Sequence, residues 1–113
     1  MDSETRGFRV ECREVGEELI AECHGKLTFE NTQALKDAVR DKIPGHREIV
    51  IDLKEVPKVD SSGLGTLVGL YVSARTRGCR VEVINANEQI RELFSMTNLL
   101  SVFEPVGRHG RTL

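Results

Sequence analysis

The sequence predicts an α/β domain built on one mixed sheet of four or five strands, with helices packed mainly on one face. Two short alternating segments near the start predict an antiparallel hairpin. Helical and strand patterns then alternate, which gives the order β-β-α-β-α-β-α with room for a last strand. Because strand–helix–strand connections are right-handed, the helices of such units fall on the same face of the sheet.

Composition limits the function classes. The 113 residues suffice for one domain, and the net charge of -2, the lack of Trp and the lack of a basic stripe argue against direct nucleic-acid binding. The start is polar and no run reaches membrane-spanning length, so we expect a cytoplasmic protein that binds no membrane. Cys12, Cys23 and Cys79 are widely spaced without a C-x-x-C pair, and we expect reduced thiols.

The predicted hairpin rests on apolar residues that alternate with polar ones. These are Phe8, Val10 and Cys12 in the first segment and Leu19, Ala21 and Cys23 in the second. Val15-Gly16-Glu17 predicts the turn between the two strands, and the second strand extends to about Gly25. We expect residues 1–7 to be frayed.

The middle of the chain predicts a helix followed by a buried strand. Thr28 is the expected cap of a helix over about residues 30–42, which Pro44-Gly45 ends. Residues 47–53 form a nearly continuous apolar run, which predicts a central strand covered by helices on at least one face. Residues 54–58 connect this strand to the next helix.

Two more helices and a strand follow. The first helix begins near Ser62 and ends before Gly78, a typical C-cap residue. Residues 79–84 predict a strand, and Asn87 caps a helix that ends at Thr97-Asn98. Residues 99–103 are expected to hold a short strand or apolar turn, and residues 107–113 a loose end of the domain that spans 1–113.

The stretch from Val59 to Gly65 lies where a loop enters a helix, and it carries the main candidate site. The first N–H groups of a helix lack intrahelical partners, so Asp60 is expected to cap them. The same helix end favours an anion, so Ser61 or Ser62 there could carry a phosphate without unfolding the helix. An ordinary capped helix start and a modification site are equally compatible with these residues.

Catalytic chemistry has weaker support. The nucleophile motif G-x-S-x-G is absent, and His24, His46 and His109 are expected at the surface or in loops. Gly69 stands one residue too late for a dinucleotide fingerprint with Gly63 and Gly65, so close packing and partner approach are favoured, with weak nucleotide binding left open. No set of His, Cys and carboxylates has metal-ligand spacing, so the sequence predicts no metal or other cofactor and no catalytic residue.

The run from Ile49 to Leu67, with Asp60-Ser61-Ser62-Gly63-Leu64-Gly65 at its centre, resembles the signature of STAS domains. It is most similar to that of bacterial anti-sigma factor antagonists. Gly25-x-Leu27 and the segment from Ile90 to Leu99, followed by Phe103, are similar to the same family, so the resemblance covers almost the whole chain. It implies the STAS fold and a binding module that is not an enzyme.

The resemblance also implies a phosphorylation switch. The unphosphorylated antagonist binds an anti-sigma factor that is a serine kinase, and thereby frees the sigma factor for transcription. Phosphorylation of the serine that matches Ser61 releases the antagonist, and a PP2C-type phosphatase restores it. The implied partner-binding residues are Thr28, Asp60, Ser62, Gly63, Leu64 and Gly65. Small Gly63 and Gly65 would allow close approach, and Leu64 would add apolar contact.

One position departs from the family pattern. Thr28 stands where many antagonists have an acidic residue that helps to form the partner face. The departure leaves room for a STAS scaffold or regulatory subunit of a stress-signalling or lipid-transport complex, without a phosphorylation cycle. A weak homodimer is compatible with either alternative, and a nucleotide-handling protein that uses residues 63–69 is the third hypothesis.

Overall fold

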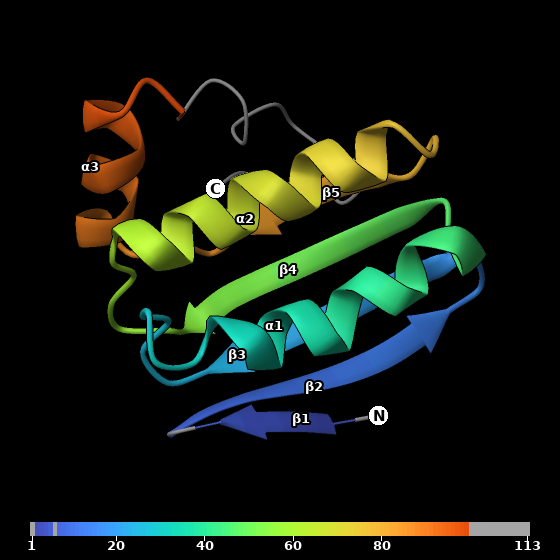
Figure 1. Ribbon diagram of the computed structural model, residues 1–113, viewed down its shortest axis with the longest axis horizontal. Coiled ribbons are helices and arrows are strands. Elements are labelled where there is room, and N and C mark those ends of the chain that lie inside the picture. Colours follow the sequence, from blue (N-terminus) through green and yellow to red (C-terminus); the bar gives the residue numbers. More distant parts are fainter. Residues whose placement is uncertain (1, 6, 100–113) are drawn as a thin grey trace.

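The fold is a five-stranded mixed sheet with its helices on one face (Figure 1). The computed structural model describes residues 2–5 and 7–99. The strands are β1 (Asp2–Thr5), β2 (Phe8–Val15), β3 (Glu18–His24), β4 (Glu48–Glu55) and β5 (Arg80–Ile84), and they lie in this order across the sheet. The first three strands pair antiparallel and the last three pair parallel, so the predicted fold class is confirmed.

Strand β1 corrects the expectation that residues 1–7 fray. Asp2–Thr5 pairs antiparallel with β2, with Thr5 opposite Phe8. Gly7 has a φ of 78°, a conformation that glycine adopts without steric cost and that suits the reversal between the two strands. The alternation of apolar and polar residues that marks a half-buried strand is missing from Asp2–Thr5, so the sequence pattern did not predict this strand.

The core lies between the sheet and the helices α1 (Thr32–Val39), α2 (Ser61–Arg75) and α3 (Glu88–Met96). Alternate residues of the strands point toward the helices and are buried: Phe8, Val10, Leu19, Ala21, Ile49, Ile51, Leu53, Val81 and Val83. The helices contribute, among others, Leu35, Leu67, Leu70, Ile90 and Phe94. The predicted central position of residues 47–53 is confirmed, because β4 lies between β3 and β5.

The residue that stabilises the loop between β3 and α1 is Asn31, whereas Thr28 was predicted as the helix cap. Thr28 does not cap the helix, which begins at Thr32 with Asn31 in the cap position. The Asn31 side chain is 3% exposed, and its Nδ2 donates to the carbonyl of Lys26 at 2.7 Å while its Oδ1 accepts from the Thr28 N–H at 2.8 Å. Asn31 therefore braces the loop that precedes α1, and its side chain makes no cap bond to the helix.

The other predicted helix boundaries agree closely with the structure. After α1, a 3-10 helix η1 (Arg40–Gly45) continues the turn to the Pro44-Gly45 stop. Asn87 caps α3 through its Oδ1, which accepts from the Ile90 N–H at 2.9 Å. The last segment predicted as a strand, residues 99–103, and the predicted loose end, 107–113, lie outside the described residues except for Leu99. Within residues 2–5 and 7–99, every helix is too short or too polar to cross a bilayer.

Candidate functional site

The candidate site lies at the sheet edge where the parallel strands end and the three α-helices begin. Residues 56–60 connect β4 to α2 and run beside the loop that follows β3. Leu27 forms a parallel bridge with Val59, the Leu27 N–H donates to Lys58 O at 2.9 Å, and the Asp60 N–H donates to Leu27 O at 3.2 Å. The carboxyl ends of parallel strands are the usual place for ligand sites in α/β folds, so this edge is well placed for function.

Asp60 connects the two loops through one carboxylate. Its Oδ1 accepts from the Gly63 N–H at 2.9 Å, which confirms the predicted cap of α2. Its Oδ2 accepts from the Phe29 N–H at 3.0 Å, a bond across 31 positions of the chain. A negative charge at the start of a helix is stabilised by the helix dipole, so this position suits both bonds.

Ser61 and Ser62 are the first two residues of α2, and both are exposed. The Ser62 carbonyl also accepts the Thr66 hydroxyl at 3.0 Å, within the first turns of the helix. The N–H groups of the first helical turn and the helix dipole attract anions. Both serines therefore lie on an exposed helix start, where the helix dipole favours an anion.

Gly63 and Leu64 are both buried, so neither is exposed to a partner as the family resemblance implies, while Gly63 provides the close packing that the sequence predicted. A Cβ at position 63 would lie 2.5 Å from Leu27 O and 2.9 Å from Leu27 Cγ, so Gly63 is required for contact inside the domain. Leu64 is only 6% exposed and belongs to the core, as does Val59, and these two positions flank the helix cap as in a hydrophobic staple. Gly65 is exposed with open space around it, which agrees with the predicted close approach.

A groove of about 460 Å³ runs between α1 and α2 next to the two serines. Ser62, Gly65 and Gly69 of α2 line one side of the groove, while Lys36 of α1 and Arg40, the first residue of η1, line the other. Phe29 lies at the same groove and is 73% exposed, which is unusual for a side chain of its size. The groove therefore combines one exposed aromatic side chain, two positively charged side chains and two glycines that leave one side without bulky groups.

Phe29, Lys36 and Arg40 are the site residues that sequence reasoning missed. Phe29 follows Thr28 in a loop, and an apolar aromatic residue between Thr28 and Glu30 is the signal that could have identified it. Lys36 and Arg40 lie four positions apart, so helical periodicity places them on one side of the helix, but it does not show which side faces α2. Thr28 is half-buried and precedes Phe29 in the same loop.

The cysteines fit the expectation of free thiols. Cys12, Cys23 and Cys79 are unbridged, and the last two are buried. Burial raises the pKa of the Cys23 thiol far above its usual range, with smaller contributions from Cys12 and Asp52. Burial also raises the pKa of the Cys79 thiol, with help from Glu48. A raised thiol pKa keeps these groups protonated and unreactive at neutral pH.

Comparison with known proteins agrees with this architecture. The family model of the STAS domain matches residues 9–111. A STAS-domain containing protein of Pseudomonas aeruginosa is 27% identical over 89 residues, which cover 79% of this chain and 88% of that protein. The crystal structure of a putative anti-sigma factor antagonist from Thermotoga maritima superposes with a TM-score of 0.76 at 26% identity, over 82% of this chain and 81% of that one.

The Bacillus anti-sigma factor antagonist SpoIIAA has the same fold. Its unphosphorylated form superposes with a TM-score of 0.66 at 18% identity, over 77% of this chain and 82% of that one. Its phosphorylated form gives a TM-score of 0.68 at 18% identity, over 83% and 86%. The chain described here belongs to the STAS family, and its relatives include proteins named as anti-sigma factor antagonists.

The contrast between Gly63 and Gly65 gives a matched test of the site geometry. Gly63→Ala should lower the free energy of unfolding by about 1–3 kcal/mol, because the new methyl group collides with Leu27. Gly65→Ala should leave stability unchanged or raise it by up to about 1 kcal/mol, because Ala favours helices and has open space there. Urea unfolding of both variants measures the difference, and equal stabilities would contradict the packing of Gly63 against Leu27.

Proposed function

We propose that this protein is an anti-sigma factor antagonist that is switched by phosphorylation at Ser61. In the unphosphorylated state it binds an anti-sigma factor with serine kinase activity in the cytoplasm, and the sigma factor is then free to direct transcription. Phosphorylation releases the antagonist, and a PP2C-type phosphatase returns it to the binding state. The protein is thus a kinase substrate and a binding module, not an enzyme.

The exposed position of Ser61 at a rigid, capped helix start carries this proposal. A phosphoryl group adds a charge of about -1.5 to -2 at neutral pH. The domain itself tolerates this charge at the N-terminus of α2, since the helix dipole favours anions there. A partner packed against the same surface must instead desolvate the dianion, which is costly without a matching cation.

The partner surface that we propose is smaller than the set of residues the family resemblance implies. Ser61, Ser62 and Gly65 are exposed on α2, and Phe29 and Thr28 lie in the loop that Asp60 holds beside them. Gly63 and Leu64 support this surface from inside through their contacts with the core. The solved structures of SpoIIAA in unphosphorylated and phosphorylated forms support a phosphorylation cycle by analogy of fold.

Substitutions at Ser61 test the switch. A kinase captured from native lysate by the unmodified protein, then purified, should place phosphate on the wild type and on Ser62→Ala but not on Ser61→Ala. Ser61→Ala should bind the kinase like the wild type, since the partner contacts remain. Phosphorylated wild type should bind roughly 100-fold more weakly, a change of about 2.7 kcal/mol, and Ser61→Asp should bind more weakly to a smaller extent.

The control for added charge is Ser95→Asp, an exposed position in the last turn of α3 that is outside the proposed partner surface. Titration calorimetry with the purified kinase should give it the affinity of the wild type. Full binding by Ser61→Asp, with no phosphate detected at residue 61 by mass spectrometry, would contradict the switch. Equal capture of a scaffold or membrane complex by the wild type and Ser61→Asp would favour a STAS regulatory subunit.

Phe29 should act as an anchor of the proposed partner surface. Aromatic side chains that are exposed in the free protein and buried at the centre of an interface often contribute about 2 kcal/mol or more to binding. Phe29→Ala should therefore weaken kinase binding by tenfold or more, while urea unfolding remains close to that of the wild type because the ring is 73% exposed.

Val15→Ala is the matched control for Phe29→Ala. Val15 is 53% exposed and ends β2 at the hairpin with β3, away from the sheet edge where the three α-helices begin. Its truncation should leave kinase affinity unchanged. Equal affinities of Phe29→Ala and the wild type would remove the α1–α2 groove from the proposed interface.

A further inference from the structure

The face of the sheet opposite the helices carries an unusual row of carboxylates. Glu11 of β2 lies directly opposite Glu22 of β3, and Glu22 lies directly opposite Asp52 of β4. Adjacent strands are about 4.7–4.9 Å apart, and like charges placed directly opposite each other destabilise a sheet. Three neighbouring carboxylates in register therefore call for a compensating positive charge.

Neighbouring residues bind the two ends of this row, whereas Lys54 lines the same hollow as Glu22 without forming an ion pair with it. Arg9 lies 3.3 Å from Oε2 of Glu11, and the Asn85 side chain donates to Oδ1 of Asp52 at 3.0 Å. Among residues 7–99, the carboxylate of Glu22 has neither an ion pair nor a hydrogen bond. Glu22 is nonetheless half-buried, so its charge is partly removed from water.

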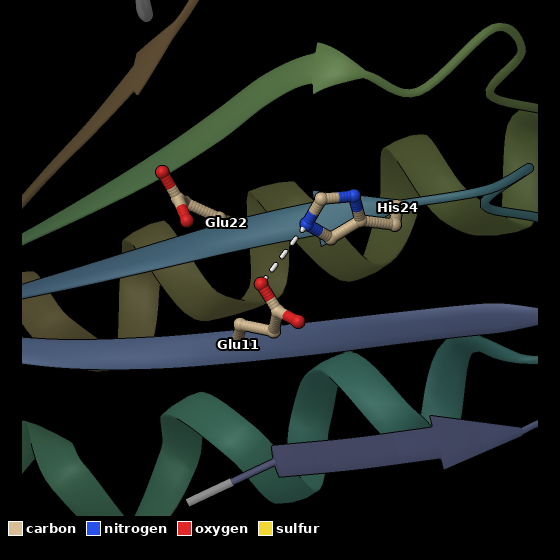
Figure 2. A group of neighbouring side chains, drawn as sticks. All are labelled: Glu11, Glu22 and His24. Carbon is tan, nitrogen blue, oxygen red and sulfur yellow. Dashed lines mark ion pairs between the residues drawn. The ribbon is translucent and has the colours of Figure 1, made fainter.

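His24 brings a nitrogen donor to the same place. It ends β3 two residues after Glu22, so both side chains project from one face of the sheet (Figure 2). Its Nε2 is closed off from solvent and lacks a hydrogen-bond partner, although it lies 3.4 Å from Oε1 of Glu11. One donor atom from each of Glu11, Glu22 and His24 lies within 4.8 Å of the others.

We propose that Glu11, Glu22 and His24 bind a divalent transition-metal ion of the zinc type. Zinc binds His nitrogen at about 2.0–2.1 Å and carboxylate oxygen at about 2.0–2.2 Å, so two ligands of a tetrahedral ion are about 3.4 Å apart. The separation of 3.4 Å between His24 Nε2 and Glu11 Oε1 matches this value. The Glu22 oxygen lies within 4.8 Å of the other two donor atoms, so binding would require its side chain to move closer, and water would be the fourth ligand.

The donor set decides which cation fits. Imidazole suits zinc and its transition-metal neighbours, whereas magnesium and calcium prefer oxygen donors alone. The ion would supply the positive charge that the carboxylate row lacks at Glu22. It would also join β2 to β3 at the base of the loop that carries Phe29. The metal site contains no residue of the proposed partner surface. A test of metal binding is therefore independent of the proposed function.

Sequence spacing did not predict this site, and the expectation of no metal site followed from that spacing. Glu11 and the pair Glu22 and His24 lie in different strands, and only the antiparallel register of β2 and β3 brings them together. An i, i+2 pair on one strand with a carboxylate from its neighbour gives no local motif of the kind found in zinc fingers.

Calorimetric titration of the 113-residue chain with zinc sulfate tests the proposal. The wild type should bind one zinc ion per chain, and Glu22→Gln and His24→Gln should each weaken that binding by tenfold or more. Glu17→Gln is the matched control, since Glu17 is an exposed carboxylate that pairs with Arg47. Zinc should also raise the melting temperature of the wild type and of Glu17→Gln, but not that of Glu22→Gln.

Circular dichroism of each variant confirms that it is folded, and Glu22→Gln preserves the shape of the side chain if His24→Gln does not fold. In nitrogen-15 spectra of the wild type, zinc should shift the imidazole signals of His24. Wild-type zinc affinity in both Glu22→Gln and His24→Gln would overturn the proposal. So would the lack of saturable binding to the wild type up to millimolar zinc.

Discussion

The geometry of the site depends on the carboxylate of Asp60. Its Oδ1 accepts a hydrogen bond from the Gly63 N–H and caps the start of α2. Its Oδ2 accepts a hydrogen bond from the Phe29 N–H and fixes the loop that follows β3. Residues from two distant parts of the chain thereby meet beside Ser61. Because the two bonds use the same charged group, the helix start and the neighbouring loop are fixed relative to each other.

Core packing also stabilises the contact between the start of α2 and the loop that follows β3. Gly63 allows α2 to approach Leu27, and Leu64 and Val59 lie in the core on either side of the cap. The signature sequence therefore contains two kinds of residue: internal ones that hold the helix start, and exposed ones, Ser61 and Gly65, that are available to a partner. A charge added to Ser61 would fall on the exposed kind of residue, which is compatible with the proposed switch.

Local signals in the sequence predicted most of the fold. Alternating apolar and polar residues identified the β2–β3 hairpin, and a continuous apolar run identified β4. The capping residues Asp60 and Asn87 located the starts of α2 and α3. The errors arose where long-range contacts decide. Pairing with β2 forms β1, and Asn31 replaces Thr28 in the cap position of α1. The exposure of Phe29 and the pairing of Glu11 with Glu22 depend on tertiary structure, which periodicity does not encode.

In the proposed switch, phosphorylation of Ser61 changes the surface charge without refolding the domain. Backbone amide chemical shifts and hydrogen exchange, compared between the unphosphorylated and phosphorylated protein, test whether the fold is kept. Shifts confined to the start of α2 and the loop around Phe29, with unchanged protection of β4 and β5, are the predicted result. Loss of protection in those strands, or large shifts throughout α3, would show that the phosphate acts by rearranging the fold.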